Sequence, residues 1–147
     1  MDELIPDYGP IRNVLKVNVY GKKNLYYDET TKGYRWPARR ADRHAKGSYG
    51  SLRRSPVVKE CWMGALLALP ATMDLYSLGV ETRPSRILAA TLQNYGAYIV
   101  DDTAWDVYVL VRERSPTGRF TNEFKKNWGF TRCLFACVCI GSHKILL

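Results

Sequence analysis

The sequence predicts an α+β fold with mostly antiparallel strands and one main helix packed on a sheet. Residues 11–20 and 105–111 alternate apolar with polar side chains, as half-buried strands do. Residues 82–96 carry apolar side chains at helical spacing. Because a sheet must bury one face against another layer, we expect a sandwich or jelly-roll-like fragment.

The first elements are predicted to form a hairpin. Along residues 11–20, three aliphatic side chains alternate with polar neighbours: Leu15, Val17 and Val19. Residues 21–24 are typical of a turn, and residues 25–27 of the returning strand. Residues 28–33 are polar and end in glycine, which indicates a second turn.

The middle of the chain predicts a buried strand and a short helical turn. Residues 61–69 are apolar on both faces, which favours a central strand covered from two sides. Pro70 ends this run. Residues 74–78 are predicted to form one helical turn before Gly79.

The main helix is predicted from Ser85 to Tyr95. Pro84 suits a first helical turn, where its missing N–H costs nothing. Gly96 suits the left-handed position that often ends a helix. Three side chains share one helical face: Leu88, Leu92 and Tyr95.

A carboxylate cluster follows the strand predicted over residues 97–100. Asp102 and Asp106 could span the roughly 5 to 9.5 Å that glycoside hydrolysis requires between two carboxyl groups. Clustered carboxylates also bind calcium, and Asp-Asp-Thr is good turn chemistry, so three interpretations stay open. The candidate catalytic residues are Asp102, Asp106 and His44. Trp105 begins an alternating strand, which is more typical of a core residue than of a sugar contact.

Residues 34–54 form a basic aromatic loop, with one helical turn expected over residues 37–45. Its cations and rings suit an anionic glycan, or single-stranded nucleic acid through phosphate pairing and base stacking. A solvated arginine-rich surface is the third interpretation. Together with the acidic cluster, the candidate ligand-binding residues are Tyr34, Arg35, Trp36, Arg39, Arg40, Asp101, Asp102, Trp105 and Asp106.

Composition limits the class of protein. The 147 residues favour one domain, and the net charge of +8 permits polyanionic partners without requiring them. No apolar run reaches the roughly 20 residues that a membrane-spanning helix needs. The acidic N-terminus does not resemble a signal peptide, so we expect either a cytoplasmic protein or a piece of a longer exported one. No cofactor is predicted, because phosphate-binding glycine loops and metalloprotease motifs are missing from the sequence.

Residues 131–147 form an apolar tail that contains three of the four cysteines. The ligand types Cys133, Cys137, Cys139 and His143 suit zinc, but their spacing differs from the usual pairs, and we predict no metal there. A buried strand or an aberrant terminus are the other interpretations. Such a tail would also favour aggregation.

Several segments resemble an uncharacterised family of exported bacterial and archaeal proteins. The most specific is Tyr95-Gly-Ala-Tyr-Ile-Val-Asp-Asp-Thr-Ala-Trp-Asp106, supported by residues 9–20, 33–38 and 63–70. The resemblance implies that residues 1–130 are the C-terminal half of a larger β-rich domain, and that the protein is extracellular. The family usually has histidine at the position of Asn13. No catalytic residue is implied.

These observations predict a glycan-associated extracellular domain that binds carbohydrate. A polyanion- or nucleic-acid-binding module, acting through residues 34–54, is the first alternative. A glycosidase or lyase that uses Asp102 and Asp106 is the second. Oligomeric state and substrate are not predicted.

Overall fold

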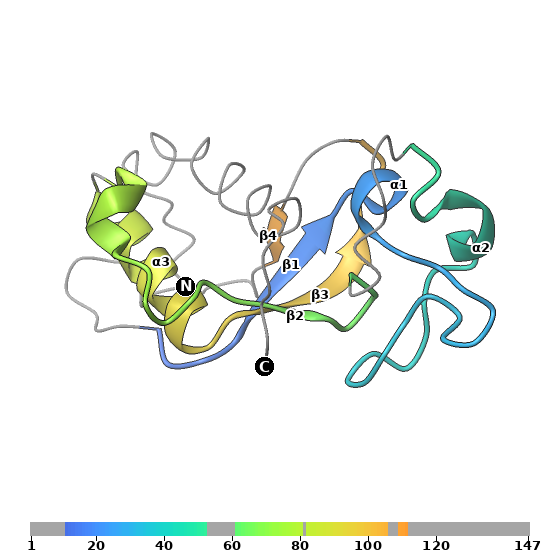
Figure 1. The fold of residues 1–147 in the computed structure, drawn as a ribbon, viewed down its shortest axis with the longest axis horizontal. Helices are drawn as coiled ribbons and strands as arrows, with labels where there is room; N and C mark the ends of the chain where they lie inside the picture. Colours follow the sequence, from blue (N-terminus) through green and yellow to red (C-terminus); the bar gives the residue numbers. More distant parts are fainter. Residues whose placement is uncertain (1–10, 53–60, 81, 106–108, 112–147) are drawn as a thin grey trace, which may run out of the picture.

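The computed structural model describes residues 11–52, 61–80, 82–105 and 109–111. These residues confirm an α+β fold, in which a small mixed sheet lies between helices at its two ends (Figure 1). The strands are β1 (Leu15–Val19), β2 (Leu66–Leu67), β3 (Ala97–Asp102) and β4 (Val109–Val111). The helices are α1 (Gly21–Asn24), α2 (Ala45–Ser48), the 3-10 helix η2 (Leu75–Leu78) and α3 (Arg83–Asn94). Among the described residues, no helix has the length and apolar character needed to cross a membrane.

The sheet has four strands in the order β2-β3-β1-β4. Its central pair, β1 and β3, is parallel, whereas β2 and β4 add antiparallel partners at the two edges. The sheet is therefore mixed, and the predicted antiparallel dominance holds only for the edge pairings. A parallel central pair needs a long crossover, which the intervening residues 20–96 supply.

The predicted hairpin after β1 is wrong. Residues 21–24 form the single helical turn α1, because the amides of Asn24 and Leu25 donate back to the carbonyls of Tyr20 and Gly21 at 3.0 and 3.1 Å. The Asn24 side chain adds a 2.9 Å bond to the Tyr20 carbonyl. The chain then leaves the sheet, and Tyr26 donates to the carbonyl of Cys61 instead of pairing with β1.

Residues 61–69 lie at an edge and not at the centre of the sheet. Only Leu66 and Leu67 form a strand, which pairs with β3 alone. Every second side chain is nevertheless buried, from Cys61 to Leu69, so this extended segment covers the core with one face. Gly64 has φ +86°, and its amide donates to the Ile99 carbonyl of β3 at 2.8 Å.

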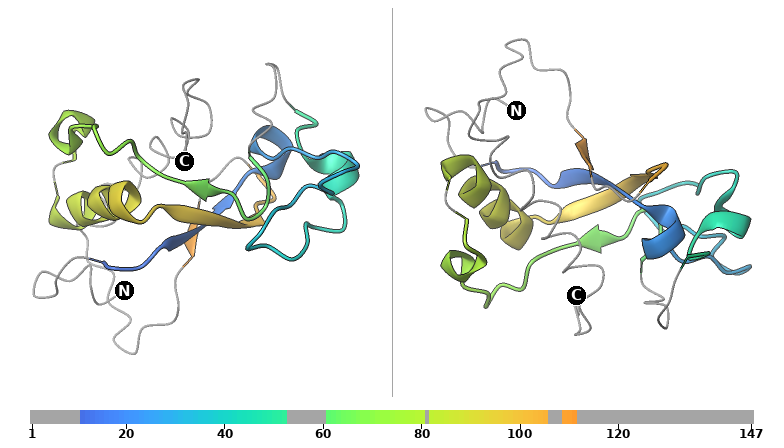
Figure 2. Two further views of the ribbon diagram at one scale, coloured as in Figure 1. Left: turned by 60° about the horizontal axis from the view of Figure 1, so that its bottom comes forward. Right: turned by 90° about the horizontal axis from the view of Figure 1, so that it is seen from above.

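The main helix is confirmed, with bounds close to the prediction. The Thr82 hydroxyl caps its first turn by accepting from the Ser85 amide, and Gly96 follows its last turn at φ +74°. Leu88 and Leu92 are buried as expected, but Tyr95 is 43% exposed because it lies past the last turn. The helix lies at the end of the sheet where β3 begins (Figures 1 and 2).

One continuous core joins the helix to the sheet. Ala89 and Leu92 of α3 belong to the same buried cluster as Val17, Val19 and Ile99 of the central strands. All five are at most 2% exposed. The alternation predicted for β1 is therefore correct and directs its aliphatic face to this core.

The remaining expectations have mixed outcomes. The turns predicted over residues 28–33 and 74–78 are present, the first organised by Asp28 and the second as η2. The helical turn in the basic loop lies at Ala45–Ser48 and not over residues 37–45. A second sheet, as a sandwich requires, is not seen within the described residues. The tail 131–147 lies outside them.

Candidate functional site at the loop end of the sheet

Main-chain hydrogen bonds fasten the basic loop to the rest of the fold. Arg35 donates to the carbonyl of Met63 at 2.9 Å, and Met63 donates to Gly33 at 3.1 Å. Further along, Gly50 donates to the Gly21 carbonyl at 3.1 Å. Because these bonds hold both ends of residues 33–50, the loop has a defined conformation from which side chains can be presented.

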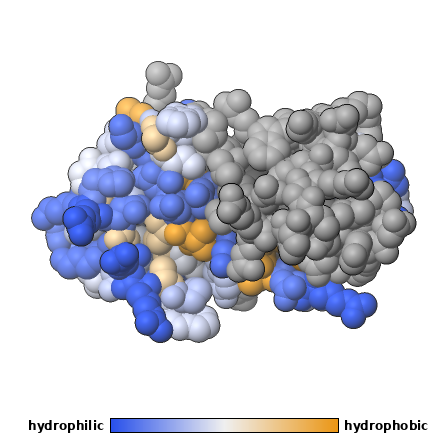
Figure 3. Space-filling model, turned by 180° about the vertical axis from the view of Figure 1, so that it is seen from behind, coloured by the Kyte–Doolittle hydropathy of each residue, from blue (hydrophilic) through white to orange (hydrophobic). Residues whose placement is uncertain are grey.

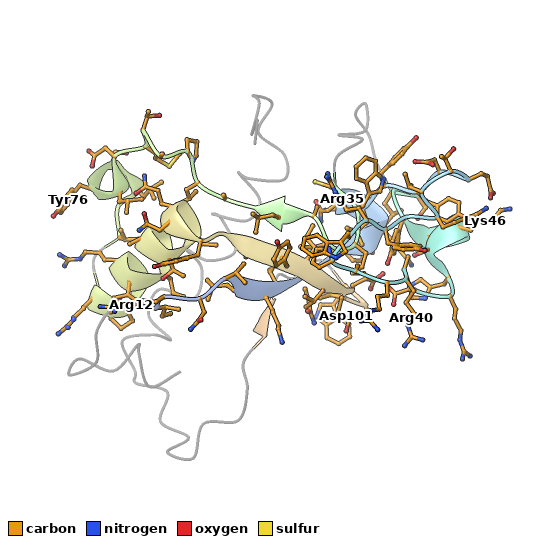
Figure 4. All side chains as sticks on the ribbon, turned by 90° about the horizontal axis from the view of Figure 1, so that it is seen from below. Arg12, Arg35, Arg40, Lys46, Tyr76 and Asp101 are labelled. Atoms are coloured by element: carbon orange, nitrogen blue, oxygen red, sulfur yellow. The ribbon has the colours of Figure 1, made fainter. Side chains whose placement is uncertain are left out.

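We call this end of the molecule the loop end: residues 20–52 together with the last residues of β3. Figure 2 shows that α1 and α2 lie at the opposite end of the sheet from α3. In Figure 3 the described surface at this end is mainly hydrophilic. Figure 4 shows Arg35, Arg40, Lys46 and Asp101 gathered there, far from Arg12 and Tyr76.

The strand β3 carries Asp102 to the loop end, where it meets His44. The two residues are 58 positions apart in the sequence, yet His44 Nε2 lies 3.2 Å from Asp102 Oδ2. The His44 side chain is 60% exposed and that of Asp102 only 12%. The pair therefore presents an imidazole to solvent while its carboxylate partner is largely shielded.

A second polar pair adjoins the first. The Tyr49 hydroxyl donates to Asp42 Oδ2 at 2.5 Å, and the Asp42 amide lies 3.4 Å from the same hydroxyl oxygen. Burial, and then the hydrogen bond to Asp42, raise the pKa of Tyr49 above its usual value. Tyr49 therefore stays a neutral donor and holds one oxygen of Asp42 in place.

Together these pairs bring three potential metal ligands close to one another. One ligand atom each from Asp42, His44 and Asp102 lies within 4.8 Å of the other two. The backbone at Gly21 is shaped around this group, because a Cβ at that position would come 2.6 Å from Asp102 Oδ2. The arrangement can position a proton or a cation between two carboxylates and an imidazole.

The aromatic and basic side chains form a neighbouring surface. Trp36 is 82% exposed, and Arg35, Arg39 and Arg40 are also exposed. Tyr34 is half-buried against the core cluster, so its ring is largely structural. The Arg35 guanidinium lies 5.5 Å from the centre of the Trp62 ring, a cation–π distance that orients this arginine.

The remaining residues predicted around the acidic cluster lie in different surroundings. Asp101 is exposed and accepts from the amide of Asp102 at 2.9 Å. Both residues belong to β3 and pair with β1, so this contact lies within the strand and not in a turn. Trp105 is 67% exposed, so the core interpretation of this residue is wrong, because the chain leaves the sheet after Asp102. Asp106 lies outside the described residues, and its pairing with Asp102 stays a prediction.

Sequence reasoning missed the roles of Asp42, Tyr49 and Trp62. One signal was available, since Asp42 is the single acid of the basic loop and stands two residues before His44. Tyr49 had no such signal, because its contact with Asp42 depends on the position of α2.

No protein-family model matches the sequence, and neither a curated protein nor a solved structure matches it. The resemblance to the exported family therefore stays a prediction.

Proposed function

We propose that the loop end binds an anionic polysaccharide. The observation that carries this proposal is the 82% exposure of Trp36 on a loop fixed by main-chain hydrogen bonds. The flat face of a sugar ring carries C–H groups that can cover an indole, which removes apolar surface from water. A tryptophan held outward on an ordered loop is suited to that contact.

The neighbouring arginines support an acidic rather than a neutral sugar. Arg35, Arg39 and Arg40 flank Trp36 in the sequence and are all exposed. A guanidinium presents paired N–H groups that match carboxylate and sulfate oxygens. The net charge of +8 would also attract an anionic polymer before contact.

The proposal extends to the setting of the domain. We propose an extracellular protein whose described sheet belongs to a larger sandwich-like domain, and the family resemblance of residues 95–106 supports both points.

Polysaccharide affinity measurements on the full chain test this function. We expect polygalacturonate or a sulfated glycan to bind, and neutral dextran to bind much more weakly. Trp36→Ala should lower the affinity at least about tenfold, the scale of one lost contact residue. Tyr76→Ala is the matched control, because Tyr76 is 84% exposed at the opposite end of the molecule. Equal affinity of these two variants would reject the proposed surface.

Nucleic-acid binding is distinguished in the same experiment. Single-stranded DNA would bind with a log–log salt slope of about −0.7 for each phosphate neutralised. Preference for that DNA over every acidic polysaccharide would replace the glycan proposal with the nucleic-acid one.

The contact between His44 and Asp102 favours a second candidate function, a glycosidase or lyase. An exposed imidazole oriented by a shielded carboxylate can act as a general base. Asp102→Asn should then abolish turnover of a bound polysaccharide. Tyr76→Ala is again the control, because Tyr76 is 84% exposed at the opposite end of the molecule. Unchanged turnover in Asp102→Asn would end this candidate.

A further inference from the structure

We propose that Asp42, His44 and Asp102 form a binding site for a divalent first-row transition ion such as Zn²⁺. The three side chains come from the basic loop, the residue before α2 and the end of β3. Their ligand atoms all lie within 4.8 Å of one another. This cluster is not explained by sugar stacking on Trp36, so the inference goes beyond the proposed glycan binding and does not depend on it.

The spacing between the ligand atoms of His44 and Asp102 fits a single ion, and the Asp42 oxygen within 4.8 Å would have to move closer to join them. Zinc bonds to imidazole nitrogen and carboxylate oxygen at about 2.0 to 2.2 Å, so ligands at tetrahedral or right angles are about 3.0 to 3.4 Å apart. His44 Nε2 and Asp102 Oδ2 are separated by 3.2 Å. An ion can therefore replace the proton shared by this pair without a large movement of either side chain.

Two supporting contacts fix the carboxylates. Tyr49 donates to Asp42 Oδ2, which leaves the other oxygen of Asp42 able to face an ion. Asp102 is held against Gly21, where any larger residue would collide with its Oδ2. Hydrogen bonds and packing of this kind hold metal ligands in position and commonly change metal affinity by about 10- to 100-fold.

The ligand types select the class of ion. Calcium and magnesium prefer all-oxygen sites, whereas an imidazole nitrogen favours zinc and its first-row neighbours. Two carboxylates also balance the charge of a divalent ion. Because the His44 side chain is 60% exposed, the remaining coordination positions would face solvent and could take water or a ligand oxygen.

Calorimetric titration of the full chain with Zn²⁺ tests the site. The tail thiols could also bind zinc, so the parent for this experiment carries Cys133→Ser, Cys137→Ser and Cys139→Ser. We expect this parent to bind one Zn²⁺. His44→Gln should lower the affinity at least about tenfold, and Asp102→Asn should do the same. His143→Gln is the control, since His143 is the second of only two histidines.

A matched glycine pair tests the supporting geometry. Gly21→Ala should weaken Zn²⁺ binding by displacing Asp102, whereas Gly47→Ala should not, because nothing lies within 4 Å of a Cβ at Gly47. Should Gly21→Ala fail to fold, His44→Gln still decides, since its side chain is mostly exposed and makes no capping bond. Absence of Zn²⁺ binding in the serine parent, or equal affinity in His44→Gln, would overturn the proposal.

Discussion

The two ends of the sheet are stabilised in different ways. At the helix end, Ala89 and Leu92 of α3 pack with Leu67, Leu69 and Ala97 in an aliphatic cluster. At the loop end, Leu25, Ala45 and Tyr49 join the same buried cluster, and main-chain hydrogen bonds and polar side-chain pairs also hold the basic loop in place. The helix end is therefore organised by the apolar periodicity of α3. The loop end depends in addition on polar contacts between residues that are distant in the sequence.

The largest expected effect on stability comes from a substitution in the buried core at the helix end. Leu92 is 2% exposed, so Leu92→Ala removes buried methyl groups and leaves a cavity. We expect a loss of about 2 to 5 kcal/mol in the free energy of unfolding. Tyr95→Ala, at the exposed end of the same helix, should change it by less than about 1 kcal/mol. Denaturant unfolding measures both, and equal losses would contradict the core position of α3.

Docking of the basic loop depends on Gly64. A Cβ there would lie 2.2 Å from the carbonyl oxygen of Arg35, and the backbone has φ +86°. Gly79 has a similar φ of +66° but open space around it. We expect Gly79→Ala to cost about 1 kcal/mol for backbone conformation alone, and Gly64→Ala to cost about 1 to 3 kcal/mol more. Similar losses in the two variants would show that the loop does not dock closely on residue 64.

The elements that depend on local sequence patterns could be predicted from the sequence. The bounds of α3, its glycine end and the buried face of β1 follow from local patterns, and the structure confirms them. The parallel pairing of β1 with β3 could not be predicted, because it depends on a crossover of about eighty residues. The edge position of β2 was missed because an apolar run does not reveal how many strands flank it.

The candidate site was only partly predictable for the same reason. His44 and Asp102 were identified by residue type, but their contact joins positions 58 residues apart. The roles of Asp42 and Tyr49 arise from a turn of helix that lies at Ala45–Ser48 and not over residues 37–45 as expected. Residue types therefore predicted the chemistry available at the loop end but not its arrangement.

An intermediate effect on stability is expected from the half-buried hydrogen bond between Tyr49 and Asp42. Tyr49→Phe removes the hydroxyl that donates to Asp42 and should cost about 1 kcal/mol at neutral pH. The pKa of Tyr49 is raised in the folded state. Its contribution to the free energy of unfolding is therefore complete below about pH 10, the pKa of tyrosine in the unfolded chain, and it is lost as the pH rises above that value. Tyr49→Phe should therefore lose less stability than the parent between about pH 10 and 11. Identical alkaline behaviour of the two proteins would contradict a buried Tyr49 donor.

The smallest effect is expected from the exposed ion pairs of Glu29, which accepts from Lys32 and Lys46 at 2.7 Å each. The bond from Lys32, and then the bond from Lys46, lower the pKa of Glu29 from 4.5 to about 2. A lowered carboxyl pKa stabilises the fold above the unfolded value, and this stabilisation is lost as pH falls from 4.5 toward 2.

Glu29→Gln should slightly reduce the fall in the free energy of unfolding at acidic pH. Adding about 1 M salt should remove most of the difference between this variant and the parent protein, because salt screens exposed charges. Lys46→Met removes the ion pair that joins Glu29 to α2, whereas Lys32→Met removes the ion pair between Glu29 and a residue of the same turn. A larger effect of Lys46→Met would mean that the pairing helps to hold α2 against the 28–33 turn. An effect of Glu29→Gln as large as that of Leu92→Ala would contradict the larger contribution of buried apolar packing than of exposed ion pairs to the stability of the fold.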